Sequence, residues 1–143
     1  MIPILSPWAR PDQARKSTQK SLRQRVLVVE DELIIGETAA EALTDAGYEV
    51  FTATSAEEAG IVLRDVSVDV LFTDINLGGQ DGFELAQAAL SRQPLLSVVF
   101  TSSRSRICHG MCTSMEVPFL AKPYRLTELV ETVERALKAV TTQ

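Results

Sequence analysis

Five polar side chains lie at the ends of four short apolar runs of the sequence. They are three carboxylates, one hydroxyl and one ammonium group: Glu30, Asp31, Asp74, Thr101 and Lys122. Two carboxylates about 4 Å apart repel by about 4 kcal/mol at an effective dielectric constant of about 20, so three in one pocket must bind protons or a cation. Lys122 neutralises only one charge, which favours a hard divalent cation with oxygen ligands, and Mg²⁺ fits best. The chain has one His and no Cys near these positions, which argues against zinc.

The same groups can carry out phosphoryl transfer. Glu30, Asp31, Asp74 and one backbone carbonyl near Asp74 are the candidate protein ligands of the cation. A carboxylate beside Mg²⁺ and a lysine can attack phosphorus, while the cation and Lys122 neutralise the phosphoryl oxygens. Thr101 can donate a hydrogen bond to a bound phosphoryl oxygen, a charge-assisted bond of roughly 1.5–3 kcal/mol. The cluster therefore predicts magnesium-dependent phosphoryl chemistry on a carboxylate.

Strands that alternate with helices must position these groups. We expect strands over residues 26–29, 48–53, 68–73, 95–100 and 117–121, and helices over 33–46, 55–64, 83–90, within 102–116, and over 126–140. Apolar residues at helical spacing, a helix stop at Gly47 and the capping pair Ser55 and Glu58 support the helices. Such alternation predicts a parallel α/β sheet whose strands all end at one edge, where ligands bind at the switch point in strand order.

Composition limits the class of protein. A chain of 143 residues holds one domain plus at most a tail. Hydrophobic residues make up 45% and charged residues 23%, which excludes wholesale disorder, collagen-like repeats and coiled coil. No apolar run approaches the ~20 residues of a membrane span. Two cysteines exclude a disulfide framework, so we expect a reducing, cytoplasmic compartment.

The charge is divided unevenly along the chain. Residues 1–25 carry a net charge of +5 and half of the six prolines, whereas residues 26–143 carry −10. The first part has no helical or strand periodicity and is a poor signal peptide, so we interpret residues 1–24 as a flexible basic extension and residues 25–143 as the domain. The alternative is a basic arm for nucleic acid or an anionic membrane. We favour a solvated tail and do not expect a nucleic-acid partner.

Four motifs, taken in order, resemble the receiver domain of two-component response regulators. They lie at residues 28–32 (VVEDE), 72–82 (FTDINLGGQDG), 99–102 (VFTS) and 119–124 (FLAKPY). The resemblance covers the chain from about Arg25 to the C-terminus. It implies a flavodoxin-like (βα)5 fold, a doubly wound sandwich around a five-stranded parallel sheet in the order 2-1-3-4-5.

The resemblance also implies roles for the residues that match the motifs. Asp74 is the implied phosphoacceptor, charged by a histidine kinase or a histidine phosphotransfer protein. Glu30 and Asp31 are the implied Mg²⁺ ligands, together with Asp74 and the backbone carbonyl of Asn76. These roles make the chain a signalling switch that acts through contacts with an unidentified protein target.

The switch itself is implied at three further positions. Thr101 matches the switch hydroxyl, Phe119 the switch aromatic and Lys122 the lysine of the catalytic set, and the bond from Lys122 to Pro123 is expected to be cis. A phosphoryl group adds about −1.5 to −2 charges, which draws Thr101 and Lys122 inward, and Phe119 follows. In the family, the face formed by the fourth helix, fifth strand and fifth helix is a usual contact surface, through which a homodimer can form.

Three features depart from the family pattern. Gly78 stands where the family often has Pro, and with Gly79 it predicts a looser loop. Ser102 stands where Ala or Gly is common, and a larger polar group there narrows access to the phosphoryl group. Residues 103–116 match poorly, which predicts a short or irregular fourth helix.

Alternatives remain at this point. One is a phosphatase that forms an aspartyl phosphate, although such enzymes have an Asp-x-Asp motif on the first strand. Another is a binding module that works without phosphorylation. We favour a stand-alone receiver with weak autophosphorylation and autodephosphorylation, not a turnover enzyme. Cys108, His109 and Cys112 do not have the spacing of a standard zinc or haem site.

Overall fold

The structure of the protein is a computed structural model that describes residues 23–103 and 117–141. Strands and helices alternate along it as the sequence predicts. The strands are β1 (Arg25–Val29), β2 (Glu49–Ala53), β3 (Val70–Asp74), β4 (Asn76–Leu77), β5 (Gln80–Asp81), β6 (Ser97–Ser102) and β7 (Phe119–Ala121). The helices are α2 (Leu33–Asp45), α3 (Ala56–Asp65), α4 (Gly82–Arg92) and α5 (Leu126–Thr141). None of these helices is both long and apolar enough to span a bilayer.

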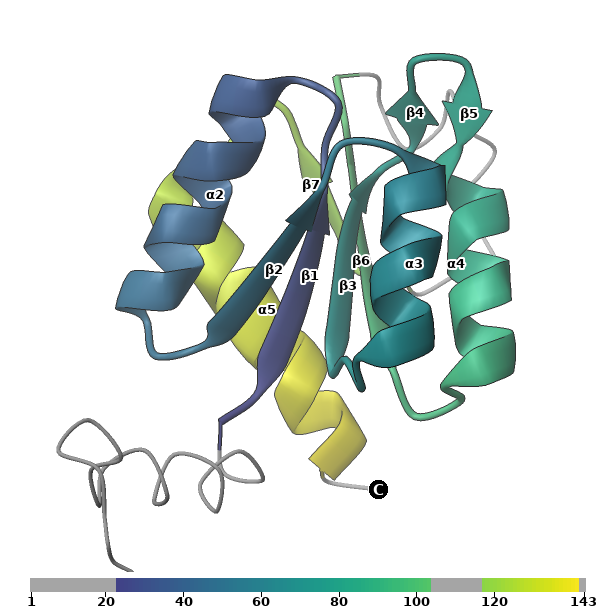
Figure 1. Ribbon diagram of the computed structural model, residues 1–143. Coiled ribbons are helices and arrows are strands. Elements are labelled where there is room, and N and C mark those ends of the chain that lie inside the picture. Colours follow the sequence, from purple (N-terminus) through teal and green to yellow (C-terminus); the bar gives the residue numbers. More distant parts are fainter. Residues whose placement is uncertain (1–22, 104–116, 142–143) are drawn as a thin grey trace, which may run out of the picture.

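Five strands form one parallel sheet in the order β2-β1-β3-β6-β7. Helices α2 and α5 cover one face of this sheet, and α3 and α4 cover the other (Figure 1). The order is the predicted 2-1-3-4-5 order of the long strands, with the short β4–β5 hairpin inserted after the third. The flavodoxin-like fold class is therefore confirmed.

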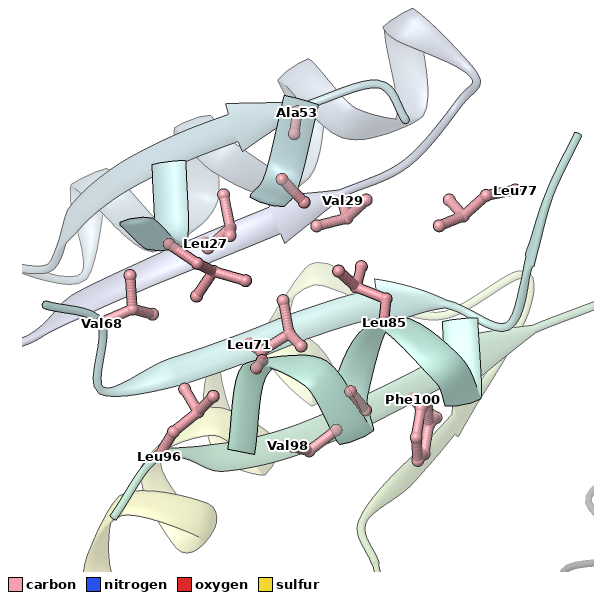
Figure 2. Packing of buried hydrophobic residues seen from close by; sticks show 14 of the residues in the cluster. Leu27, Val29, Ala53, Val68, Leu71, Leu77, Leu85, Leu96, Val98 and Phe100 are labelled. Carbon is pink, nitrogen blue, oxygen red and sulfur yellow. The ribbon is translucent and has the colours of Figure 1, made fainter. Parts of the chain in front are cut away.

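Alternating residues of the buried strands supply two hydrophobic clusters. In β1, Leu27 and Val29 face α3 and α4, whereas Val26 and Val28 face α2 and α5. Each of these four side chains is at most 1% exposed, and burying one contributes roughly 1.5–3 kcal/mol. Figure 2 shows the first cluster, where side chains of the sheet meet Leu85 of α4. A sheet buried on both faces explains why the strands are continuous apolar runs.

The residues predicted to end α2 and to begin α3 do so, and only one hydrogen bond differs from the prediction. Gly47 follows α2 with a φ of 106°, a conformation that glycine adopts without steric cost. The Ser55 side chain accepts a hydrogen bond from the Glu58 amide at 3.1 Å and begins α3. The Glu58 carboxylate reaches back to the Thr54 amide at 2.7 Å, one residue before the position that a capping box would give.

Three strands begin two residues later than predicted, and the β4–β5 hairpin was predicted as a loop. The Val68 amide is bound by the Gln93 side chain at 2.7 Å instead of by a neighbouring strand. Leu95 is 83% exposed and lies outside β6. The later boundaries place Asp74 and Thr101 inside their strands, where the two residues pair. Predictions for residues 104–116, including Cys108, His109 and Cys112, and for residues 1–22 lie outside the described residues.

Candidate functional site

One ammonium group joins the ends of three strands. Lys122, which follows β7, places Nζ 2.6 Å from Oδ2 of Asp74 at the end of β3. The same Nζ lies 2.8 Å from Oε1 of Glu30, which follows β1. Glu30 is 3% exposed and Asp74 6%, so both carboxylates are buried. The structure thus brings together three of the predicted site residues from distant parts of the chain.

Burial and ion pairing shift the pKa values of Glu30 and Lys122 in opposite directions. Burial raises the pKa of Glu30 above its usual range, and the hydrogen bond and charge of Lys122 oppose this rise. Burial alone would lower the pKa of Lys122, but hydrogen bonds to Asp74 and Glu30 outweigh it and hold that pKa well above its ordinary value. Lys122 therefore stays protonated at any physiological pH and keeps a positive charge beside Asp74.

Tyr124 packs near this cluster, against the hydrophobic core. Its ring meets Phe72 edge to face, with ring centroids 5.8 Å apart. Burial raises the pKa of Tyr124 to about 12, and the charge of Glu30 adds to this rise. The side chain is therefore a neutral phenol and adds no charge to the cluster.

Backbone contacts fix the position of Asp74. The Asn76 amide donates to Oδ1 of Asp74 at 3.0 Å, and the Ile75 amide donates to the Thr101 carbonyl at 2.9 Å. The Gly82 amide donates to the Ile75 carbonyl at 2.7 Å. A Cβ on Gly82 would overlap the Asp74 carbonyl oxygen, so only glycine allows α4 to begin this close to the candidate acceptor.

The loop after Asp74 is a tight hairpin and not the looser loop that its glycines suggested. Gly78 and Gly79 have φ values of 61° and 98°, and Leu77 pairs with Gln80 across them. A two-residue turn with both φ values positive matches the twist of a hairpin and favours Gly-Gly. Proline cannot occupy position 78 here, because its ring holds φ near −65°. The Gln80 side chain accepts a hydrogen bond from the Ala56 amide at 2.9 Å and attaches the hairpin to α3.

Three consecutive acids form the candidate metal centre. Glu30, Asp31 and Glu32 each offer one carboxylate oxygen, and these oxygens lie within 4.8 Å of one another. Asp31 also lies near the hairpin, since a Cβ on Gly78 would be 3.3 Å from its Oδ2. Oxygen-only donors next to the carbonyl-bearing loop after Asp74 fit a hard divalent cation. Sequence reasoning missed Glu32, although the run of three acids was a visible signal.

A helix-capping role explains only part of this acidic run. Glu32 is the N-cap of α2, but its side chain makes no capping hydrogen bond. Oε2 of Glu30 accepts from the Glu32 amide at 3.2 Å. Glu30 therefore supports the start of α2 with one oxygen and faces Lys122 with the other.

Thr101 and Phe119 lie at the same edge on neighbouring strands. Thr101 is 1% exposed, and its hydroxyl has no hydrogen-bond partner among the described residues. Buried hydroxyls are nearly always paired, so this hydroxyl has hydrogen-bonding capacity that the described residues do not use. Phe119 is half-buried against the α3–α4 cluster and pairs with Phe100 of β6, the residue next to Thr101.

The sequence and the fold match known signalling proteins. A family model of the response regulator receiver domain matches residues 26–134. The DNA-binding transcriptional regulator NtrC of Salmonella typhimurium is 32% identical over 114 residues, 78% of this chain and 24% of that protein. The uncharacterized transcriptional regulatory protein YrkP of Bacillus subtilis is 34% identical over 119 residues, 82% of this chain and 51% of that protein.

Solved structures give the same result. A response regulator receiver protein from Sinorhizobium medicae superposes with a TM-score of 0.75 at 26% identity, covering 82% of this chain and 97% of that one. The chemotaxis response regulator CheY4 of Vibrio cholerae superposes with a TM-score of 0.73 at 28% identity, covering 80% and 99%. The chain spans about a quarter of the length of NtrC. It belongs to the response regulator receiver domain family, the phosphorylation-dependent switches of two-component signalling.

Proposed function

We propose that this receiver domain accepts a phosphoryl group on Asp74 from a histidine kinase or a histidine phosphotransfer protein. The observation that carries the proposal is the position of Lys122, whose Nζ lies within 2.8 Å of carboxylate oxygens of both Asp74 and Glu30. A fixed cation beside a buried carboxylate stabilises the charge that develops on a transferring phosphoryl group.

Mg²⁺ is the cofactor that fits the acidic group. Glu30, Asp31, Asp74 and the backbone carbonyl of Asn76 would hold it, and the Glu32 carboxylate lies beside them. When bound, the ion neutralises charge on the carboxylates and on the phosphoryl oxygens. The cluster needs this charge, because Lys122 balances only one of its carboxylates.

The chain's own residues then perform the transfer. A carboxylate oxygen of Asp74 attacks phosphorus, a P–O bond forms, and the P–N bond to the donor imidazole breaks while the imidazole takes up a proton. Lys122 pairs with a phosphoryl oxygen as the charge of Asp74 is consumed in the new bond. The Thr101 hydroxyl donates to another phosphoryl oxygen, which satisfies its missing hydrogen bond.

The switch follows from this new hydrogen bond. Movement of Thr101 toward the phosphoryl group changes the packing of Phe119 on the neighbouring strand, and a partner protein reads that change. Slow hydrolysis of the aspartyl phosphate resets the switch, so the chemistry is weak autophosphorylation and autodephosphorylation and not turnover of a substrate. We place this function in the cytoplasm, in a domain over residues 25–143 that follows a basic extension over residues 1–24.

The direct test is phosphorylation of the full chain by phosphoramidate, whose P–N bond matches that of a phosphohistidine. With Mg²⁺ present, intact-protein mass spectrometry is expected to show the gain of one phosphoryl group, and Asp74→Asn is expected to abolish it. Asp65→Asn, at the exposed end of α3, serves as the matched control and should be phosphorylated like wild type. An unchanged mass in wild type would contradict the proposal.

Beryllofluoride with Mg²⁺ tests the switch separately, because it mimics a bound phosphoryl group. Amide resonances near Asp74, Thr101 and Phe119 are expected to shift in wild type and not in Asp74→Asn. Turnover of a phosphomonoester by wild type but not by Asp74→Asn would favour a phosphatase. Partner binding that is equal with and without beryllofluoride would favour a binding module that ignores phosphorylation.

A further inference from the structure

Two grooves adjoin on the face that α2 and α5 form. The first has a volume of about 480 Å³, and three carboxylates line it: Glu41 and Asp45 of α2 and Glu131 of α5. Its floor is apolar, with Ala42 and Val130, and no cationic side chain of the described residues lines it. We name it the acidic groove.

The second groove has a volume of about 450 Å³ and begins where the first ends, since Thr38 and Leu126 line both. Apolar side chains dominate it, including Ile34, Ile35, Pro123 and Tyr124, and Lys122 also lines it. We name it the apolar groove. The two form a continuous path from the C-terminal end of α2 to the candidate phosphorylation site.

The apolar groove exposes side chains that water does not favour. Ile34 is 77% exposed and Leu126 is 41% exposed, on either side of the same groove. Adjoining exposed apolar side chains of this kind favour contact with an apolar occupant. A matching occupant must be apolar at one end and basic at the other.

The first residues of the chain have this composition, and in the required order. Read backward from Arg23, the sequence first gives basic residues and then apolar ones: Lys20, Lys16, Arg15, Arg10, Trp8, Leu5, Ile4 and Ile2. From the C-terminal end of α2 toward its N-terminal end, the face presents first carboxylates and then apolar side chains. The order of the two patterns agrees only if the chain reaches this face from the end of α2.

The described part of the chain begins at that end. The Glu49 amide donates to the Gln24 carbonyl at 3.0 Å, and Glu49 follows Asp45, the last residue of α2, by only four positions. Residues 8–22 can span roughly 50 Å when extended, whereas α2, with 13 residues, is about 20 Å long. The segment is therefore long enough to pass both grooves.

We propose that residues 2–20 bind along this face of their own chain, with the basic residues in the acidic groove and Trp8 in the apolar groove. Attachment at Gln24 gives the segment an effective concentration on the order of mM, so even a weak contact is substantially occupied. The contact does not rest on the proposed function.

The test uses Trp8, the only tryptophan of the chain, as a fluorescent probe in the full-length protein. We expect a blue-shifted emission and quenching by acrylamide about twofold weaker than for a peptide of residues 1–22, because a seated indole is shielded. Raising the ionic strength from about 0.01 M to about 1 M should weaken the charge pairing and make Trp8 as accessible as in the peptide.

Substitutions in the two grooves separate their contributions. Glu41→Lys with Glu131→Lys should expose Trp8 by reversing the charge of the acidic groove, and the exposed Ile34→Ser should do so by removing an apolar wall. Glu57→Lys with Asp65→Lys makes the same charge change on α3, on the opposite face, and should leave the emission unchanged.

Three results would overturn the contact. They are wild-type quenching equal to that of the peptide, emission that neither groove variant changes, and emission that changes on dilution, which would assign the groove to a second copy of the chain. The triple variant Arg15→Glu, Lys16→Glu and Lys20→Glu should also make Trp8 as accessible as in the peptide, because it removes the charge pairing with the acidic groove. An unchanged emission in this variant would also overturn the contact. A protein that is never phosphorylated contradicts the proposed function and leaves the fluorescence result intact.

Discussion

The site has an inner and an outer half that are built by different means. The inner half consists of buried or half-buried residues at strand ends: Glu30, Asp74, Thr101 and Lys122. The outer half consists of exposed residues before α2 and in the β4–β5 hairpin: Asp31, Glu32, Asn76, Gly78 and Gly79. The inner half is held by the parallel sheet and one ion-pair network, whereas the outer half is held by a hairpin turn and the start of α2.

The two halves are suited to two different tasks, stabilisation of charge in the inner half and exchange of a cation in the outer half. In the inner half, Lys122 is bound to both carboxylates before any phosphoryl group arrives, so little reorganisation is needed there. In the outer half, the carboxylates of Asp31 and Glu32 have solvent on one side and can exchange water for a cation. Substitutions in the inner half should therefore change stability and chemistry together, whereas loss of an outer carboxylate should change cation affinity alone.

Lys122→Met should have the largest effect, because it leaves two buried carboxylates without their cation. We expect the phosphorylation rate to fall about 100-fold or more and the free energy of unfolding without Mg²⁺ to fall by about 3 kcal/mol. Phosphoramidate kinetics and urea unfolding measure the two effects. Arg64→Met removes an exposed cationic side chain of α3 and should change both by little.

The pH dependence of stability sharpens this prediction. The pKa of Lys122 is higher in the folded protein than its ordinary 10.5, so its stabilising contribution is fully present below pH 10.5 and is lost as the pH rises through the folded value. Between pH 10.5 and the folded pKa, the free energy of unfolding of wild type should fall with pH more steeply than that of Lys122→Met. The difference in slope should be up to about 1.4 kcal/mol per pH unit. Parallel curves for the two proteins above pH 10.5 would contradict the ion-pair network.

Gly82→Ala should be next in size, since a Cβ there would overlap the Asp74 carbonyl oxygen and lie 2.9 Å from Cα of Ile75. The backbone around the candidate acceptor Asp74 must move, and we expect a loss of about 3 kcal/mol in the free energy of unfolding. Gly60→Ala is the matched control, because nothing lies within 4 Å of its added Cβ in the middle of α3. That variant should gain about 0.5–1 kcal/mol. Equal effects of the two substitutions would show that the approach of α4 to Asp74 is not tight.

The inner half is the part of the site that the sequence predicts well. Each of its residues follows or ends an apolar run, and the rule that parallel strands end at one edge brings them together without further information. Glu30, Asp74 and Lys122 meet as this rule predicts, although the strand limits were early by two residues in three cases. The predicted first residues of these strands are wrong because hydropathy does not reveal that a side chain such as Gln93 binds the backbone before β3.

The outer half was harder to predict, because its geometry depends on turns. Gly78 and Gly79 predict a loose loop from the sequence, but their positive φ values make a hairpin turn. The Gln80 side chain attaches this hairpin to α3, 24 positions away in the sequence. Glu32 belongs to the acidic group through its place at the start of α2, and the family motif gives no role to it. The two grooves depend on how α2 and α5 pack, which no local pattern specifies.

Gly78→Ala should separate the outer half from the inner half. An alanine at a φ of 61° costs about 1 kcal/mol, and its Cβ would lie 3.3 Å from Oδ2 of Asp31. Gly79→Ala has a larger backbone cost, because a φ of 98° lies outside the left-handed region that alanine tolerates, and nothing lies within 4 Å of its Cβ. We expect Gly79→Ala to lose at least as much stability, but only Gly78→Ala to weaken Mg²⁺ binding, by about threefold to tenfold, as measured by calorimetry. An equal loss of affinity would assign the effect to the hairpin and not to Asp31.

Glu32→Gln should have the smallest effect and decides whether the third acid belongs to the metal centre. Its carboxylate oxygen lies within 4.8 Å of those of Glu30 and Asp31, but the side chain is exposed, so loss of its charge should weaken Mg²⁺ binding only about two- to threefold. The effect should shrink as ionic strength rises, because exposed charges are screened. Glu37→Gln removes an equally exposed charge within α2 and should leave the affinity unchanged. If the two variants lose the same affinity, Glu32 contributes only to the general negative charge of the surface, and the outer half contains a single carboxylate ligand, Asp31.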